Sequence, residues 1–132
     1  MRRRSELCAF KFEDIYQALN RNPAIRLNFS KTDQFETGKI LPISQELFYV
    51  VENWRTIISD EGYILRSISR HVYIGINMHP TSVSTRLKAL QKDLKIDSDG
   101  HPLSGHSFRV GAALDLLEQG EPLERIMLRG GW

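Results

Sequence analysis

A histidine and an arginine stand three residues apart near the C-terminal end of the sequence, as His106 and Arg109. They begin a segment whose apolar residues recur at helical spacing, for example at Val110, Leu114 and Leu117. Residues three apart share one face of a helix, and the first turn carries the positive end of the helix dipole and unpaired backbone N–H groups. The pair could therefore cradle a phosphate, although spacing alone favours two solvated polar residues.

Residues that typically begin or end helices predict the elements that would position this pair. Ser104 lies directly before the helical pattern and suits its N-cap. Gly120 predicts the end of the helix, and Pro122 suits the first turn of the next one. That second helix would run to the Gly-Gly-Trp sequence at 130–132, so the sequence predicts two helices joined by a tight turn.

The string GHSFRVGAALDLLEQG followed by ERIMLRGGW resembles the C-terminal half of the catalytic domain of tyrosine recombinases, the phage integrase family. That family carries a His-x-x-Arg box that opens a helix, then a short helix and a Gly-Gly-His or Gly-Gly-Trp turn. Its other signatures are an early Arg-x-x-Glu box, matched by RRSE at 3–6, and a lysine on a β-hairpin, matched by SKTD at 30–33. Three boxes in this order, from Arg3 to Trp132, make a specific match.

The resemblance implies that the site binds and cleaves a phosphodiester of double-stranded DNA. A tyrosine hydroxyl attacks the phosphorus and leaves a 3′-phosphotyrosyl bond and a free 5′-hydroxyl, and a second 5′-hydroxyl reverses the step. Arg3 and Arg109 would hold the non-bridging oxygens, where negative charge grows in the transition state. His106 would donate a hydrogen bond to one of these oxygens or help to move the proton of the nucleophile. The resemblance implies no cofactor and no metal ion.

The remaining site residues are also implied by the resemblance. Lys31 would be the general acid that protonates the departing 5′ oxygen, and Lys39 across the same hairpin competes for that role. Trp132 takes the His or Trp position of the family and would supply an indole N–H donor, or merely an apolar anchor. Glu6 would position the site, as a partner of His106 or of the backbone.

The nucleophilic tyrosine of the family, a short distance beyond the Gly-Gly-Trp turn, has no match. The tyrosines of this sequence are Tyr16, Tyr49, Tyr63 and Tyr73. The N-terminal DNA-clamping domain of the family has no match either. These departures predict a single catalytic domain over residues 1–132, truncated at both ends, that binds DNA phosphates without cleaving them. Family members assemble as tetramers on DNA, and some donate the tyrosine from a neighbouring subunit.

The rest of the sequence predicts a mostly α fold with a small antiparallel β-hairpin, an α+β class. Ile25, Leu27 and Phe29 alternate with polar residues as in a half-buried strand, and residues 39–43 predict the returning strand. Ser44 suits the N-cap of the clearest amphipathic helix. Its predicted apolar stripe consists of Leu47, Val50, Val51, Trp54, Ile57 and Ile58.

Another helix is predicted after Pro80, with Thr81 or Ser82 as its cap. Arg86 and Lys88 lie on its outer side, where they are ordinary solvated charges or contacts to a DNA backbone. Its predicted buried face consists of Val83, Leu87, Leu90 and Leu94.

Composition sets broad limits. The 132 residues are enough for one domain with a core, and 41% hydrophobic and 26% charged residues are typical of globular proteins. A net charge of +2 permits nucleic-acid binding without arguing for it. Cys8 is the only cysteine, and no apolar run reaches membrane-spanning length, so we expect a cytosolic protein. The resemblance implies a prokaryotic cytosol or nucleoid. His71 and His79 lack companion metal ligands.

Two alternatives stay open beside a recombinase of a phage or other mobile element. One is a non-catalytic DNA-binding remnant of a decayed integrase. The other is an unrelated α-rich interaction domain in which the boxes match by chance. The sequence does not distinguish integration from excision or resolution.

Overall fold

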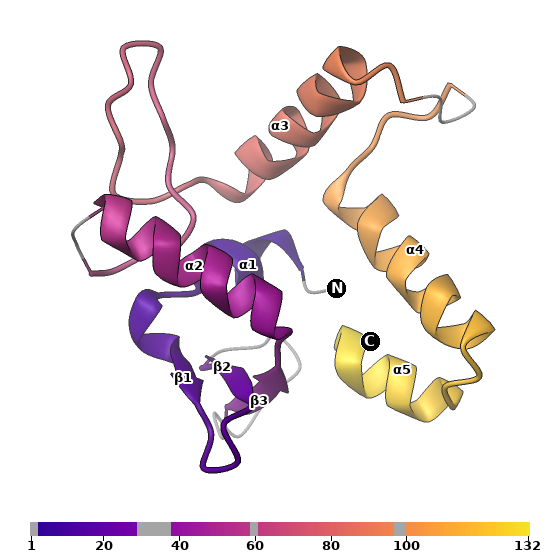
Figure 1. Ribbon diagram of the computed structural model, residues 1–132. Coiled ribbons are helices and arrows are strands. Elements are labelled where there is room, and N and C mark those ends of the chain that lie inside the picture. The colour runs from indigo at the N-terminus through magenta and orange to yellow at the C-terminus, as the bar shows by residue number, and fades with distance from the viewer. Residues whose placement is uncertain (1–2, 29–37, 59–60, 97–99) are drawn as a thin grey trace. The chain divides into compact units, whose positions relative to one another are not determined.

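The computed structural model describes residues 3–28, 38–58, 61–96 and 100–132, and it has an α+β fold (Figure 1). The elements in chain order are α1 (Arg4–Ala9), a 3-10 helix η1 (Phe12–Asp14), β1 (Ile15–Gln17), β2 (Pro23–Leu27), β3 (Lys39–Pro42), α2 (Gln45–Ile58), α3 (Pro80–Asp93), α4 (Gly105–Glu118) and α5 (Leu123–Gly130). The predicted mostly helical fold with a small antiparallel sheet is confirmed. No helix in the described ranges is long and apolar enough to cross a membrane.

The chain divides into two compact units. Residues 8–78 form the sheet unit, which contains the three strands and α2. Residues 1–7 and 79–132 form the helical unit, which contains α3, α4 and α5. The single catalytic domain expected over residues 1–132 stays a prediction.

The three strands of the sheet unit pair antiparallel in the order β1-β2-β3. In the central strand β2, Ile25 pairs with Ile15 on one side and with Leu41 on the other. Ile25 and Leu27 are buried while Arg26 between them is exposed, which confirms the predicted alternation. Phe29, the last residue of the predicted strand, lies outside the described residues.

The core of the sheet unit is centred on Phe12, which is 1% exposed. Two backbone hydrogen bonds fasten its segment to the chain that follows α2. Phe12 N–H donates to Gly62 O at 2.9 Å, and Ile64 N–H donates to Phe10 O at 3.0 Å. The Arg55 guanidinium also lies 5.7 Å from the centre of the Phe12 ring, so it helps to cover Phe12.

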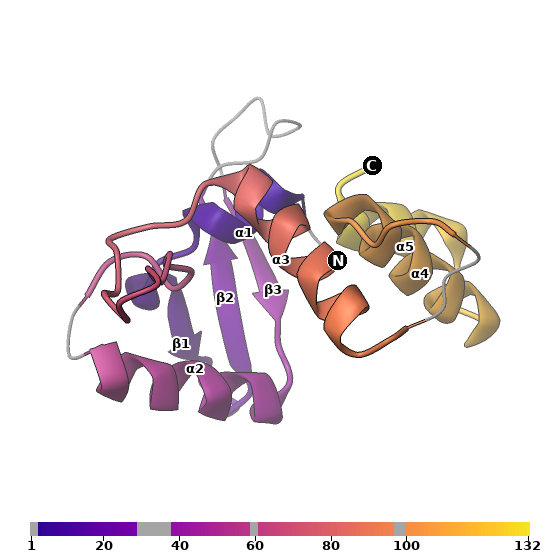
Figure 2. The same ribbon diagram turned by 90° about the horizontal axis from the view of Figure 1, so that it is seen from above.

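Helix α2 runs crosswise to the strands near the end of β3 (Figure 2). Its predicted cap is confirmed, because Leu47 N–H donates to Ser44 Oγ at 3.1 Å. The predicted apolar stripe is too wide. Val51 is buried, but Val50 and Ile57 are exposed, because the sheet unit covers only a narrow strip of the helix. Trp54, predicted to pack in the core, is half-buried and donates its indole N–H to Ile64 O at 2.8 Å.

Two predictions for α3 are wrong. Its cap is His79, whose Nδ1 accepts from Thr81 N–H at 3.3 Å, and Pro80 occupies the first helical turn, where a proline loses no hydrogen bond. The predicted buried face is not buried: Leu90 is 52% and Leu94 66% exposed. The physical reason is that α3 packs only sparsely against α4, which leaves the C-terminal end of its apolar stripe exposed.

The packing of Phe12 generates a stability prediction. Replacing Phe12 with Ala should lower the free energy of unfolding by about 3–5 kcal/mol, because it removes a buried ring and leaves a cavity. Leu19→Ala is the matched control, since Leu19 is fully exposed and its loss should change stability by less than about 0.5 kcal/mol. Urea denaturation followed by circular dichroism measures both variants. Equal midpoints for the two would contradict this view of the core.

Candidate phosphate-binding site

Helix α5 ends in a turn of two glycines that leaves carbonyl groups available. Gly131 adopts a left-handed conformation with a φ of 67°, and its N–H donates to Met127 O at 2.9 Å. Trp132 N–H donates to the same carbonyl at 3.1 Å. A glycine at this position ends a helix without steric cost, while the last carbonyls of the helix remain without intrahelical partners. The carbonyls of Gly130 and Gly131 are therefore free to accept hydrogen bonds from side chains.

Arg109 reaches the first of these carbonyls from α4. The start of α4 is fixed by the predicted N-cap, since Ser107 N–H donates to Ser104 Oγ at 3.2 Å and Ser104 N–H donates to Ser107 Oγ at 3.3 Å. From the first turns of this helix the Arg109 guanidinium donates through Nη2 to Gly130 O at 3.0 Å. Its Cζ lies 4.9 Å from the centre of the Trp132 ring, and only 7% of Arg109 is exposed.

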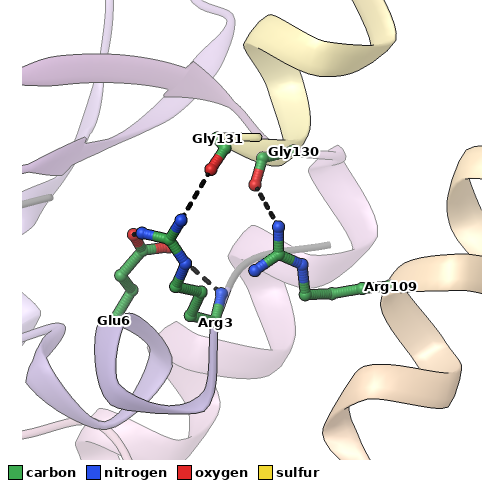
Figure 3. Close-up of polar contacts among 5 residues, drawn as sticks. All are labelled: Arg3, Glu6, Arg109, Gly130 and Gly131. Carbon is green, nitrogen blue, oxygen red and sulfur yellow. Dashed lines mark hydrogen bonds and ion pairs between the residues drawn. The ribbon is translucent and has the colours of Figure 1, made fainter. Parts of the chain in front are cut away.

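Arg3 reaches the second carbonyl from the residue before α1. Its Nη2 donates to Gly131 O at 3.0 Å, and its Nη1 lies 3.7 Å from Glu6 Oε1. The other oxygen of this buried carboxylate accepts from the Arg3 backbone N–H at 3.1 Å. Figure 3 shows both guanidinium groups directed at the two adjacent carbonyls of the turn. Residues 106 positions apart in the sequence thus meet at one point of the helical unit.

The hydrogen bonds leave part of each guanidinium unused. Arg3 Nη1 and Arg109 Nε are buried and have no hydrogen-bond partner among the described residues. Arg109 also has no carboxylate within ion-pair distance in the described ranges. A buried cation without a counter-ion is costly, so the site favours an anion that accepts from both arginines. The Glu6 carboxylate offsets one of the two positive charges, which leaves the cluster cationic.

The other predicted residues of the helical unit lie as follows. Trp132 is 45% exposed and its ring lies over Gly130, where an added Cβ would come within 2.6 Å of Trp132 Cε3. His106 is exposed in the first turn of α4 and makes no hydrogen bond or ion pair with the described residues. Arg86 and Lys88 are exposed on α3. The structure therefore gathers Arg3, Glu6, Arg109 and Trp132, and it leaves His106 open to solvent.

The two candidate general acids belong to the sheet unit. Lys31 lies outside the described residues. Lys39 is the first residue of β3 and is half-buried. The choice between the two lysines remains open.

Sequence reasoning gave no structural role to two residues that fasten the segments on which the arginines lie. Arg4 donates through Nη1 to Ser84 Oγ at 2.9 Å, and its side-chain stem lies against Gly105, where any Cβ would come within 2.5 Å of Arg4 Cγ. Gln91 holds the loop before α4, because its Oε1 accepts from Leu103 N–H at 2.7 Å and its Nε2 donates to His101 O at 3.2 Å. Gly105 was a sequence signal for the contact with the Arg4 side chain, because a glycine allows another group to approach its backbone closely. No sequence pattern indicated the contacts of Gln91.

Comparison with known proteins shows which fold the chain shares. No family model and no curated protein matches the sequence. Among solved structures, the chain is similar to a crystal structure of XerA recombinase, with a TM-score of 0.72 and 17% sequence identity. The likeness covers 99% of this chain and 44% of that one. The chain shares the fold of a recombinase. It spans less than half the length of that protein.

The close contact between Gly130 and Trp132 generates a prediction. Gly130→Ala should push the indole off the turn while changing the free energy of unfolding by less than about 1 kcal/mol, because Trp132 can move and the backbone at Gly130 needs no left-handed conformation. Iodide quenching of tryptophan fluorescence should therefore increase. Gly111→Ala is the control, because a Cβ there meets no atom within 4 Å. Equal quenching in both variants would contradict the contact.

Proposed function

We propose that the chain is catalytic-domain sequence of a tyrosine-type site-specific DNA recombinase, and that Arg3 and Arg109 bind one phosphate of double-stranded DNA. The observation that carries the proposal is the pair of guanidinium groups at one turn, in which Arg109 is buried, Arg3 is half-buried, and neither Arg109 Nε nor Arg3 Nη1 has a hydrogen-bond partner among the described residues. The fold likeness to XerA recombinase and the order of the three sequence boxes support it.

Arg109 Nε and Arg3 Nη1 would donate to the non-bridging oxygens of the phosphate. The carbonyls of Gly130 and Gly131 each hold the Nη2 donor of one guanidinium, so both groups are oriented before DNA arrives. Fixed donors directed at a site of growing negative charge stabilise a transition state without reorganisation. The Trp132 ring lies beside the Arg109 guanidinium and further restrains its plane.

The other residues take supporting roles in this proposal. Glu6 is buried and bonded to Arg3, so it positions that arginine and does not react. His106 is exposed three residues before Arg109, where it is accessible to donate to a phosphate oxygen. Lys31 is proposed as the general acid, with Lys39 as its competitor. Trp132 would add its indole N–H as a further donor.

Strand exchange through a 3′-phosphotyrosyl bond needs a tyrosine beside the phosphate. All four tyrosines within residues 1–132 belong to the sheet unit, and none matches the family position beyond the Gly-Gly-Trp turn. We therefore propose that the 132-residue polypeptide binds DNA without cleaving it. The same observation favours a second candidate, a non-catalytic DNA-binding remnant of an integrase, which would use the same phosphate site. Integration, an origin in a mobile element and assembly as a tetramer on DNA belong to the first proposal only.

The proposed phosphate contact predicts a loss of DNA affinity. Arg109→Ala should weaken binding to a duplex by about 10- to 100-fold, because a charge-assisted hydrogen bond contributes about 1.5–3 kcal/mol. The affinity of Arg109→Lys should lie between those of the unmodified chain and Arg109→Ala, since lysine keeps the charge but lacks the planar guanidinium. Fluorescence anisotropy with labelled duplex measures both. Arg125→Ala is the control, because Arg125 is exposed in the same unit and paired with Glu121. If Arg125→Ala lost a similar amount of duplex affinity, the loss in Arg109→Ala would be explained by net charge alone, and the proposed contact would be contradicted.

The missing tyrosine match predicts the outcome of a cleavage test. The 132-residue polypeptide, mixed with a nicked suicide substrate, should form no covalent protein–DNA adduct on a denaturing gel. Adding a C-terminal segment with a tyrosine-bearing helix should restore the adduct if the chain is recombinase sequence, and should not if it is a remnant. An adduct from the unextended polypeptide would reveal a nucleophile elsewhere in the chain.

A further inference from the structure

A narrow two-stranded ribbon in the sheet unit is not explained by the phosphate site. Residues 67–77 double back on themselves through backbone hydrogen bonds, from Ser67 N–H to Asn77 O at 2.9 Å and from Gly75 N–H to Ser67 O at 2.7 Å. Ile68 and Ile74 form an antiparallel bridge between them. Figure 1 shows this segment, after α2, extending as a thin projection. Two strands without a covering layer are only marginally stable in water, so core packing does not explain this segment.

The tip of the ribbon is strained and apolar. Val72 has a φ of 64°, a conformation that a β-branched residue rarely adopts and that hairpins of this kind normally give to glycine. The turn closes through Val72 N–H to Ser69 O at 3.0 Å and Tyr73 N–H to Ser69 Oγ at 3.1 Å. Val72 is 77% and Tyr73 76% exposed. Neither side chain gains enough burial in this structure to explain its presence.

The charge of the surrounding sequence points to a polyanion. Residues 62–78, the part of the sheet unit that contains the ribbon, include Arg66 and Arg70 and no aspartate or glutamate. Arg70 and His71 occupy the two central positions of the turn and are exposed. In the described ranges Arg70 forms no ion pair, so its charge is not offset by a neighbouring carboxylate.

We propose that this ribbon is a second DNA-contacting element, with Arg70 and His71 on the phosphate backbone and Val72 and Tyr73 against the sugars and bases of a groove. A two-stranded ribbon fits the major groove of B-DNA, and apolar side chains flanked by cations are the usual means of contact with base steps in a minor groove. The absence of acidic residues over 62–78 favours DNA over a protein surface. The inference rests on the proposed function and adds a contact outside its phosphate site.

The test compares Arg70→Ala and Val72→Gly with Arg21→Ala in the full 132-residue chain. Arg21 is a matched control, since it is an exposed turn arginine of the same unit and also has a positive φ, of 62°. Arg70→Ala should weaken duplex binding by about an order of magnitude and reduce the slope of log Kd against log salt by about 1. Val72→Gly should also weaken binding, while its Tm stays level or rises because glycine relieves the strained turn. Arg21→Ala should leave affinity and slope unchanged.

The outcomes separate this inference from the proposed function. If Arg70→Ala and Val72→Gly bind DNA like the unmodified chain while Arg109→Ala loses affinity, the ribbon proposal is overturned and the phosphate site stands. Equal losses for Arg70→Ala and Arg21→Ala would also overturn it, because bulk charge would then explain both. An unmodified chain without any affinity for DNA would overturn both proposals.

Discussion

The helical unit is built around a buried positive charge that no carboxylate of the described residues neutralises. Arg109 is 7% exposed, and within the described ranges its polar contact is the carbonyl of Gly130. Three local features make that burial possible. The Ser104 cap fixes the start of α4, the glycine turn ends α5 with open carbonyls, and the Trp132 ring lies beside the guanidinium. Each feature places or orients a group around the buried guanidinium.

Neutral carbonyls suit the anion site that we propose for this cluster. A carboxylate in the place of Gly130 O would also orient the guanidinium, but it would cancel the charge and compete with a phosphate for the same donors. A backbone carbonyl at the negative end of a helix dipole orients the group and leaves its full charge available. Arg3 is oriented in the same way, because its Nη2 donates to Gly131 O, and its backbone N–H donates to the Glu6 carboxylate. The cluster is thereby oriented and still cationic.

Local signals predicted much of this structure. The Ser104 and Ser44 caps, the strand alternation around Ile25 and the α+β class follow from short-range patterns that a sequence displays directly. Burial was harder to predict. The stripe of α3 looked apolar in sequence, yet Leu94 is exposed, since helical spacing does not reveal whether another element covers the face. The carbonyl contacts of both arginines involve glycines, which carry no side-chain signal. Only the family resemblance pointed to Arg3 and Arg109 as partners.

The central claim is that Arg3 and Arg109 act on the same phosphate, and a double-mutant cycle in duplex affinity tests it most directly. Kd would be measured for the unmodified chain, Arg3→Ala, Arg109→Ala and the double variant at one salt concentration. Two groups that share a ligand are coupled, so the double variant should lose little more affinity than the weaker-binding single variant, with a coupling energy of about 0.5–3 kcal/mol. Losses that simply add, or a double variant that binds as tightly as the unmodified chain, would contradict the account.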